Sequence, residues 1–239
     1  MPIELELLPD AATAARRAAS LIAERARAAL RERGRFLLAL SGGSTPLPMF
    51  DALAREPLPS EGIEIFQVDE RVAPEGDAAR NWTHIEQRLC VPAGLPAAQL
   101  HPMPATMEQP ETAAEAYART LEERAGRPPV LDLVHLGLGN DGHTASLFPG
   151  DAAVDIDQHW TAATGDHNGH RRITLTLPVL SGARSILWLV CGADKAAMLA
   201  RLLAADAGIP AGRVSQASAR IIADEAAGSA LRSAARSSH

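Results

Sequence analysis

The stretch "HLGLGNDGHTASLFPG", residues 135–150, decides how this chain is interpreted. It continues the largely apolar run "VLDLVHL" (130–136), which is typical of a strand buried on both faces of a parallel sheet. Three glycines follow in the spacing G-x-G-x-x-G of a dinucleotide-binding loop: Gly137, Gly139 and Gly142. The stretch therefore predicts either a cofactor-binding loop or a turn that presents Asp141 and His143 at the end of a strand.

The dinucleotide interpretation needs a helix after the glycines and an acidic residue about 20 positions further on. Pro149 and Gly150 leave little room for a helix, and the segment "TAATGDHNGH" (161–170) is predicted to be a loop. We therefore favour the turn. A histidine has an ordinary pKa of about 6.5 and suits general acid–base catalysis, so we expect His143 to be catalytic, with Asp141 beside it. The alternative is a loop histidine that makes only a structural hydrogen bond.

Strands and helices alternate along the rest of the chain. Strands are predicted at 3–8, 35–40, 63–68, 130–139, 171–180, 185–192 and 220–224. Helices are predicted at about 11–33, 46–54, 81–89, 110–126, 193–204 and 225–232, the first of them capped by Asp10 and stopped by Gly34. The pattern predicts an α/β fold with a mostly parallel, Rossmann-like sheet and helices on both faces.

The predicted fold is a single domain over residues 1–239, with a frayed tail from about 233. We expect the Pro-rich segment 91–110 to be a surface connection and the polar segment 150–170 to loop over the site. Ligands of parallel sheets bind outside the carboxyl ends of the strands. Four polar motifs follow predicted strands at that edge: 41–46, 69–71, 141–143 and 192–195.

The motif "SGGSTP" (41–46) has the composition of an anion-binding turn. Its glycines allow a tight turn with backbone N–H groups close to a ligand, and its hydroxyls add donors. We expect phosphate binding by Ser41, Gly42, Gly43, Ser44 and Thr45. Arg172 and Lys195 are expected to supply positive charge to the phosphate. The alternatives are a Gly-Ser turn that only caps a helix, and two solvated surface cations.

The motif "DER" (69–71) ends another predicted strand. Glu70 and Arg71 could form a surface ion pair of little energetic value. Alternatively, Asp69 or Arg71 hydrogen-bonds to sugar hydroxyls or orients the catalytic residue.

The composition excludes several classes of protein. The net charge of −6 and the pI of about 5.8 argue against nucleic acids and anionic membranes as partners. The amino-terminal segment lacks the features of a signal peptide, and no segment has the ~18 apolar residues of a membrane span. We expect Cys90 and Cys191 to be unpaired thiols of a cytoplasmic protein. The histidines show no metal-ligand spacing, so no metal is expected.

Five stretches together resemble the 6-phosphogluconolactonases of the glucosamine-6-phosphate isomerase/deaminase superfamily. They are "LALSGGSTP", "VDER", "GLGNDGHTASLFPG", "RRITLTLPVL" and "GADKA", between residue 35 and about 215. The resemblance implies cofactor-independent hydrolysis of 6-phospho-D-glucono-1,5-lactone to 6-phospho-D-gluconate in the oxidative pentose phosphate pathway. It implies that "SGGSTP", Arg172 and Lys195 hold the 6-phosphate, that His143 is the base, and that Asp69 and Arg71 line the sugar site.

One stretch departs from that family. "ARNWTH" (79–84) keeps Asn81 but has Arg80 and Trp82 where Ser-Asn-Tyr is typical, which affects the expected lactone contacts. In the related deaminases the corresponding stretch is similar to "GHIAFNEPG", and its glutamate assists the catalytic histidine. This chain has Phe148 at that position, and a phenyl ring cannot transfer a proton. A deaminase and a non-catalytic sugar-phosphate sensor are the alternative functions. We expect a monomer or a weak homodimer whose partner is a small sugar phosphate.

Overall fold

A seven-stranded sheet in which every neighbouring pair is parallel organises the molecule. The computed structural model describes residues 3–106 and 109–231. In spatial order the strands are β1 (Glu4–Leu8), β10 (Ala219–Asp224), β9 (Ile186–Val190), β6 (Leu133–Leu136), β2 (Phe36–Leu40), β3 (Ile63–Gln67) and β5 (Leu100–His101). The predicted parallel α/β sheet is confirmed.

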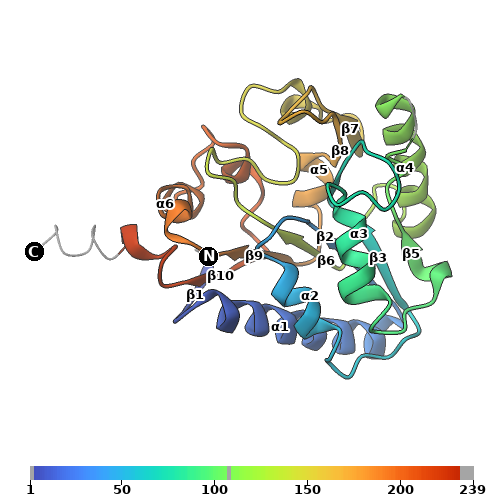
Figure 1. The fold of residues 1–239 in the computed structure, drawn as a ribbon, viewed down its shortest axis with the longest axis horizontal. Helices are drawn as coiled ribbons and strands as arrows, with labels where there is room; N and C mark the ends of the chain where they lie inside the picture. The colour runs from blue at the N-terminus through green and yellow to red at the C-terminus, as the bar shows by residue number, and fades with distance from the viewer. Residues whose placement is uncertain (1–2, 107–108, 232–239) are drawn as a thin grey trace, which may run out of the picture.

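Helices cover both faces of the sheet, as predicted (Figure 1). They are α1 (Ala11–Arg33), α2 (Leu47–Leu53), α3 (Asn81–Ile85), α4 (Pro110–Ala125), α5 (Leu177–Ser181) and α6 (Ala196–Leu203). Side chains of successive strand residues point to opposite faces, so Leu133 packs with α1 and α2 while Val134 packs with α4 to α6. None of the helices in the described residues combines the length and apolarity that a membrane crossing requires.

The first helix begins and ends where its sequence predicts. A side-chain oxygen of Asp10 accepts a hydrogen bond from the backbone N–H of Thr13 at 2.7 Å, which caps the helix. Gly34 ends it in the left-handed conformation with φ of 69°. Small alanines on the buried side let this helix lie close to the sheet: Ala14, Ala15, Ala18, Ala19, Ala23, Ala26 and Ala29.

A second, antiparallel sheet lies beside the carboxyl edge of the first and was not predicted. Its strand order is β4 (Asp69–Arg71), β8 (Arg172–Leu175) and β7 (Thr161–Ala163). The "DER" motif is thus a strand rather than the polar end of β3, and "RRITLTL" pairs with it instead of joining the main sheet. Because β4 has three polar residues, its sequence has the composition of a loop.

Other predicted boundaries also need correction. Segment 91–110 is not only a connection, because it contains the edge strand β5. Segment 150–170 contains β7, and a 3₁₀ turn (Ala152–Asp155) precedes that strand. The chain turns at 225–228 and is helical only at 229–231, where a helix from 225 to 232 was predicted. Residue 232 and the tail from about 233 lie outside the described residues.

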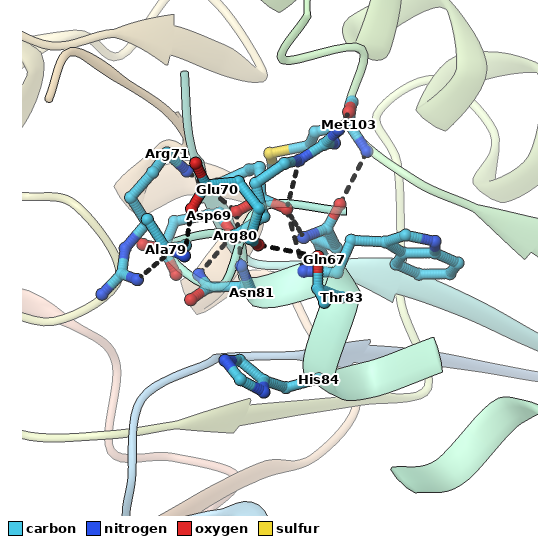
Figure 2. A network of polar contacts seen from close by, with 12 residues as sticks. Gln67, Asp69, Glu70, Arg71, Ala79, Arg80, Asn81, Thr83, His84 and Met103 are labelled. Carbon is cyan, nitrogen blue, oxygen red and sulfur yellow. Dashed lines mark hydrogen bonds and ion pairs between the residues drawn. The ribbon is translucent and has the colours of Figure 1, made fainter. Parts of the chain in front are cut away.

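The carboxylate of Glu70 fixes the connection between β3, β4 and α3 (Figure 2). Glu70 is fully buried, which rules out the alternative of a surface ion pair with Arg71. Its two oxygens accept from five donors: the side chains of Gln67 and Arg80 and the backbone N–H groups of Arg71, Asn81 and Trp82. The segment that departs from the family pattern therefore closes around a buried anion.

Replacing Glu70 by Gln should destabilise the fold strongly. An amide NH₂ group in place of one oxygen would face donors only, and the buried Arg80 would lose its counter-charge. We expect a loss of about 3 kcal/mol or more in the free energy of unfolding, measured by urea denaturation. Glu75→Gln, at an exposed position in the same connection, should change it by less than about 0.5 kcal/mol. Equal stability of the two variants would contradict this role of Glu70.

Candidate active site

A cavity of about 600 Å³ opens at the carboxyl ends of the parallel strands. Every residue expected in the site lies on its wall: Ser41, Gly42, Gly43, Ser44, Thr45, Asp69, Arg71, Asp141, His143, Arg172 and Lys195. They come from the segments after β2, β6 and β9 and from strands β4 and β8. The four polar motifs after the strands therefore converge on one cavity.

His143 and Asp141 form a hydrogen-bonded pair on the cavity wall. Asp141 Oδ1 lies 2.6 Å from His143 Nδ1 and accepts a bond from the His143 backbone N–H at 3.0 Å. Burial alone raises the pKa of Asp141, but these bonds and the charge of the ring outweigh burial and hold that pKa below its ordinary value. An ionised carboxylate only accepts, so Nδ1 carries the ring proton and the lone pair of Nε2 stays available. The His143 side chain is 32% exposed, so the pocket can reach it.

The glycine at position 139 makes room for this imidazole. A Cβ at Gly139 would lie 2.1 Å from Nδ1 of His143, far inside contact distance. The backbone N–H of Gly139 also donates to the carbonyl of His143 at 2.8 Å, which closes the loop. The G-x-G-x-x-G spacing therefore serves a histidine turn, and no helix follows it as a dinucleotide site requires.

Phe148 is the centre of a stack of rings beside His143. Its centroid lies 4.4 Å from the His143 ring and 3.9 Å from the His167 ring. The guanidinium carbon of Arg172 lies 5.2 Å from the same centroid, within the range of a cation–π contact. Phe148 thus supports the histidine and the arginine by contact but offers no titratable group.

The segment before β8 borders the cavity through Asn168 and is fastened by Asp151. Asp151 accepts from the Gly165 and Ala153 N–H groups and lies 2.7 Å from His167 Nε2. Burial raises the pKa of Asp151, but these hydrogen bonds dominate and hold it below its ordinary value. The His167 ring is thereby held against Phe148.

Two arginines stand side by side on the cavity wall. Arg71 and Arg172 are direct partners in the β4–β8 ladder, where like charges repel. Burial lowers the pKa of Arg172, and the charge of Arg71 lowers it further. The Nε atoms of both are buried without a hydrogen-bond partner in the described residues. This pair is suited to an anion, as is Lys195, which bonds to Asn140 on the same wall.

The turn after β2 packs tightly on the segment that departs from the family pattern. A Cβ at Gly42 would lie 2.0 Å from the side-chain oxygen of Asn81. The Asn81 amide donates to the Asp69 carbonyl at 2.9 Å, and the Ser146 hydroxyl donates to Asp69 Oδ2 at 2.7 Å. Arg80 and Trp82, which differ from the family pattern, do not line the cavity. They instead hydrogen-bond to the buried Glu70 behind the cavity wall.

Sequence reasoning missed several residues of the wall, among them His135, Asn140, Phe148 and Asn168. His135 alone gave a signal, because it is an imidazole within an otherwise apolar strand. It is 1% exposed, and neither ring nitrogen has a hydrogen-bond partner among the described residues. Phe148 was noted only as the absence of a glutamate.

Neither cysteine is suited to nucleophilic chemistry. Burial raises the pKa of Cys90 and of Cys191 to about 12, so both are protonated thiols at neutral pH. Both are free in the structure. Within residues 3–106 and 109–231, no group of three or more His, Cys, Asp or Glu side chains is placed to hold a metal ion.

Gly139→Ala should displace the imidazole of His143. The added methyl group overlaps Nδ1, so the ring must move and the bond to Asp141 must break. We expect a change of several ppm in the ¹⁵N shift of His143 Nδ1 and a lower melting temperature. Gly137→Ala is the matched control, because nothing lies within 4 Å of a Cβ there. Unchanged ring shifts in Gly139→Ala would contradict the tight fit.

Comparisons with known proteins agree with this geometry. The model of the family "Glucosamine-6-phosphate isomerases/6-phosphogluconolactonase" matches residues 9–223. The chain is 38% identical over 195 residues to a 6-phosphogluconolactonase of Synechocystis sp., covering 80% of this chain and 81% of that protein. It is similar to the crystal structure of a 6-phosphogluconolactonase from Thermotoga maritima, with 27% identity and a TM-score of 0.83 over 93% of this chain and 99% of that one.

The fold is also that of a monomeric glucosamine-6-phosphate deaminase, with a TM-score of 0.83 at 17% identity over 95% of this chain and 100% of the other. The fold alone therefore does not separate the two activities of the family. The family match spans nearly the whole chain. The chain belongs to the glucosamine-6-phosphate isomerase/6-phosphogluconolactonase family.

Proposed function

We propose that this protein hydrolyses 6-phospho-D-glucono-1,5-lactone to 6-phospho-D-gluconate in the oxidative pentose phosphate pathway. The observation that carries the proposal is the pairing of His143 with Asp141 on the wall of a cavity that Arg71 and Arg172 also line, with Nε atoms that lack hydrogen-bond partners in the described residues. Family membership and the 6-phosphogluconolactonases among the relatives support the same substrate. The reaction needs one activated water and one anchored anion.

The phosphoryl group binds at the turn 41–45, with Arg172 and Lys195. The residues of that turn line the cavity at the end of β2, and Arg172 and Lys195 line the same cavity. Asp69 and Arg71 contact the sugar. A local cluster of positive charge explains how a chain of net charge −6 binds a phosphate dianion.

His143 acts as the general base through Nε2. The Asp141 carboxylate holds the Nδ1 proton, orients the ring and stabilises the imidazolium that forms. Nε2 removes a proton from water as the water oxygen bonds to C1 of the lactone. The resulting oxyanion accepts hydrogen bonds from loop N–H groups or from Arg71. When the bond from C1 to the ring oxygen breaks, Nε2–H returns the proton to that oxygen.

Phe148 argues against the deaminase alternative. Opening and isomerising an aminosugar requires proton transfers at more than one atom, whereas lactone hydrolysis requires one positioned base. Phe148 is 6% exposed and its ring lies 4.4 Å from that of His143, tilted by 37°, so this position supplies no acid. A sensor without activity would have no need of the aligned His143–Asp141 pair.

The remaining expectations are proposals of the same kind. The cytoplasm is the proposed compartment, supported by two free thiols. A monomer or weak homodimer is the proposed assembly, with a small sugar phosphate as partner and no cofactor. Residues 1–239 are proposed to form one domain.

Removing the base should abolish turnover without abolishing binding. For His143→Ala we expect kcat to fall by about 10²- to 10⁴-fold, while the Kd for 6-phosphogluconate changes less than about threefold. Acid release from freshly prepared lactone, followed in a pH-stat against the spontaneous rate, measures the first. Calorimetry measures the second. His159→Ala, at an exposed position, is the control.

Removing a phosphate-binding cation should act on KM instead. For Lys195→Met we expect KM to rise by about 10- to 100-fold, as for the loss of one charged hydrogen bond. Glucosamine 6-phosphate should be tested in parallel. Ammonia release from it, together with lactone hydrolysis no faster than background, would overturn the proposed function in favour of the deaminase.

A further inference from the structure

His135 is the buried titratable group that the reaction above does not use. It lies in β6, between Val134 and Leu136, is 1% exposed, and is among the residues that line the cavity. Buried polar atoms in proteins are nearly always hydrogen-bonded, yet both ring nitrogens of His135 lack a partner in the described part of the chain. An imidazole at this position is therefore unexplained by packing alone.

The register places His135 beside the anion-binding turn. His135 pairs with Leu40, the residue before the turn, and its carbonyl accepts from the Ser41 N–H at 3.3 Å. Alternation along β6 puts its side chain on the face of Leu133, the same face as Leu40 and Leu187. The turn 41–45 leads directly into α2, and α2 packs on this same face of the sheet.

A second group without a partner in the described residues belongs to the same cavity wall. The hydroxyl of Ser41 is buried without a hydrogen-bond partner among the described residues, and it lines the same cavity. The ring nitrogens of His135 and the Ser41 oxygen are thus unpartnered polar atoms, within the described residues, of two residues that line one cavity with Leu189 and Pro46. Neighbouring groups that all lack protein partners are suited to a ligand with several acceptor oxygens.

The imidazole is uncharged at neutral pH. Burial lowers the pKa of His135 to about 3, so one nitrogen is an N–H donor and the other an acceptor. A neutral ring can hydrogen-bond to a phosphoryl oxygen without adding a third positive charge to those of Arg71 and Arg172.

We propose that His135 is a substrate-binding residue, whose ring N–H donates to the phosphoryl group from beneath the turn 41–45. This inference rests on the proposed function, because it takes the phosphoryl group to bind at that turn. The two histidines then contact opposite ends of the substrate: His143 acts at C1, and His135 binds the phosphorylated end.

The test compares His135→Leu with His135→Gln. Leucine matches the neighbouring strand residues and removes both nitrogens, whereas glutamine keeps an N–H donor. For His135→Leu we expect the Kd values for 6-phosphogluconate and inorganic phosphate, measured by calorimetry, to rise about 3- to 10-fold, with a parallel rise in KM. Glutamine should restore part of the affinity. The melting temperature of unliganded His135→Leu should equal or exceed that of the wild type, because an unpaired buried polar group has been removed.

His101→Leu is the matched control. His101 is also a buried strand histidine, but its Nε2 pairs with Glu64 at 2.8 Å and it does not line the cavity. Its replacement should lower stability and leave both Kd values unchanged. Unchanged phosphate and 6-phosphogluconate affinity in His135→Leu would overturn the inference, and so would equal losses in His135→Leu and His101→Leu. If the wild type binds phosphate through His135 but hydrolyses no lactone, the inference stands and the proposed function falls.

Discussion

The common direction of four neighbouring strands is the constraint on which the site depends. β3, β2, β6 and β9 lie side by side in parallel register, so their carboxyl ends meet at one edge. Loops that are far apart in the sequence must leave the sheet there, and each carries polar groups that need partners other than sheet neighbours. The cavity is the space these loops enclose, and its chemistry follows from which side chains each loop supplies.

Carboxylates buried near that edge of the sheet need hydrogen-bond donors from the protein, because burial removes them from water. Glu70 is buried because five donors converge on it, and Asp69 is held by Ser146. The cavity wall is different, since buried atoms of Ser41, Arg71, Asn81, His135 and Arg172 lack partners in the described residues. Each such group costs about 1–3 kcal/mol in a folded protein. The carboxylates of Glu70 and Asp69 are therefore satisfied within the protein, whereas several side chains on the cavity wall have buried atoms without partners in the described residues.

The sequence predicts the parts of the fold that depend on local composition. The strands Phe36–Leu40 and Ile186–Val190 are wholly apolar, and the first helix carries its own cap and stop residues. β4 could not be predicted, because "DER" forms a strand only through pairing with residues about 100 positions away. The same limit hides Glu70, whose burial depends on backbone donors from a later segment. His135 left a local trace, but its relation to the turn depends on strand register.

The proposed mechanism requires that the substrate span the cavity in one orientation, with its phosphoryl group at the turn 41–45 and C1 at His143. The most direct measurement is a crystal structure of the wild-type protein with 6-phosphogluconate bound. We expect phosphoryl oxygens on the turn 41–45 with Arg172 and Lys195, and the C1 carboxylate within about 3.2 Å of His143 Nε2. A product bound in the reverse direction, with its phosphoryl group against His143, would contradict the account, as would binding outside this cavity.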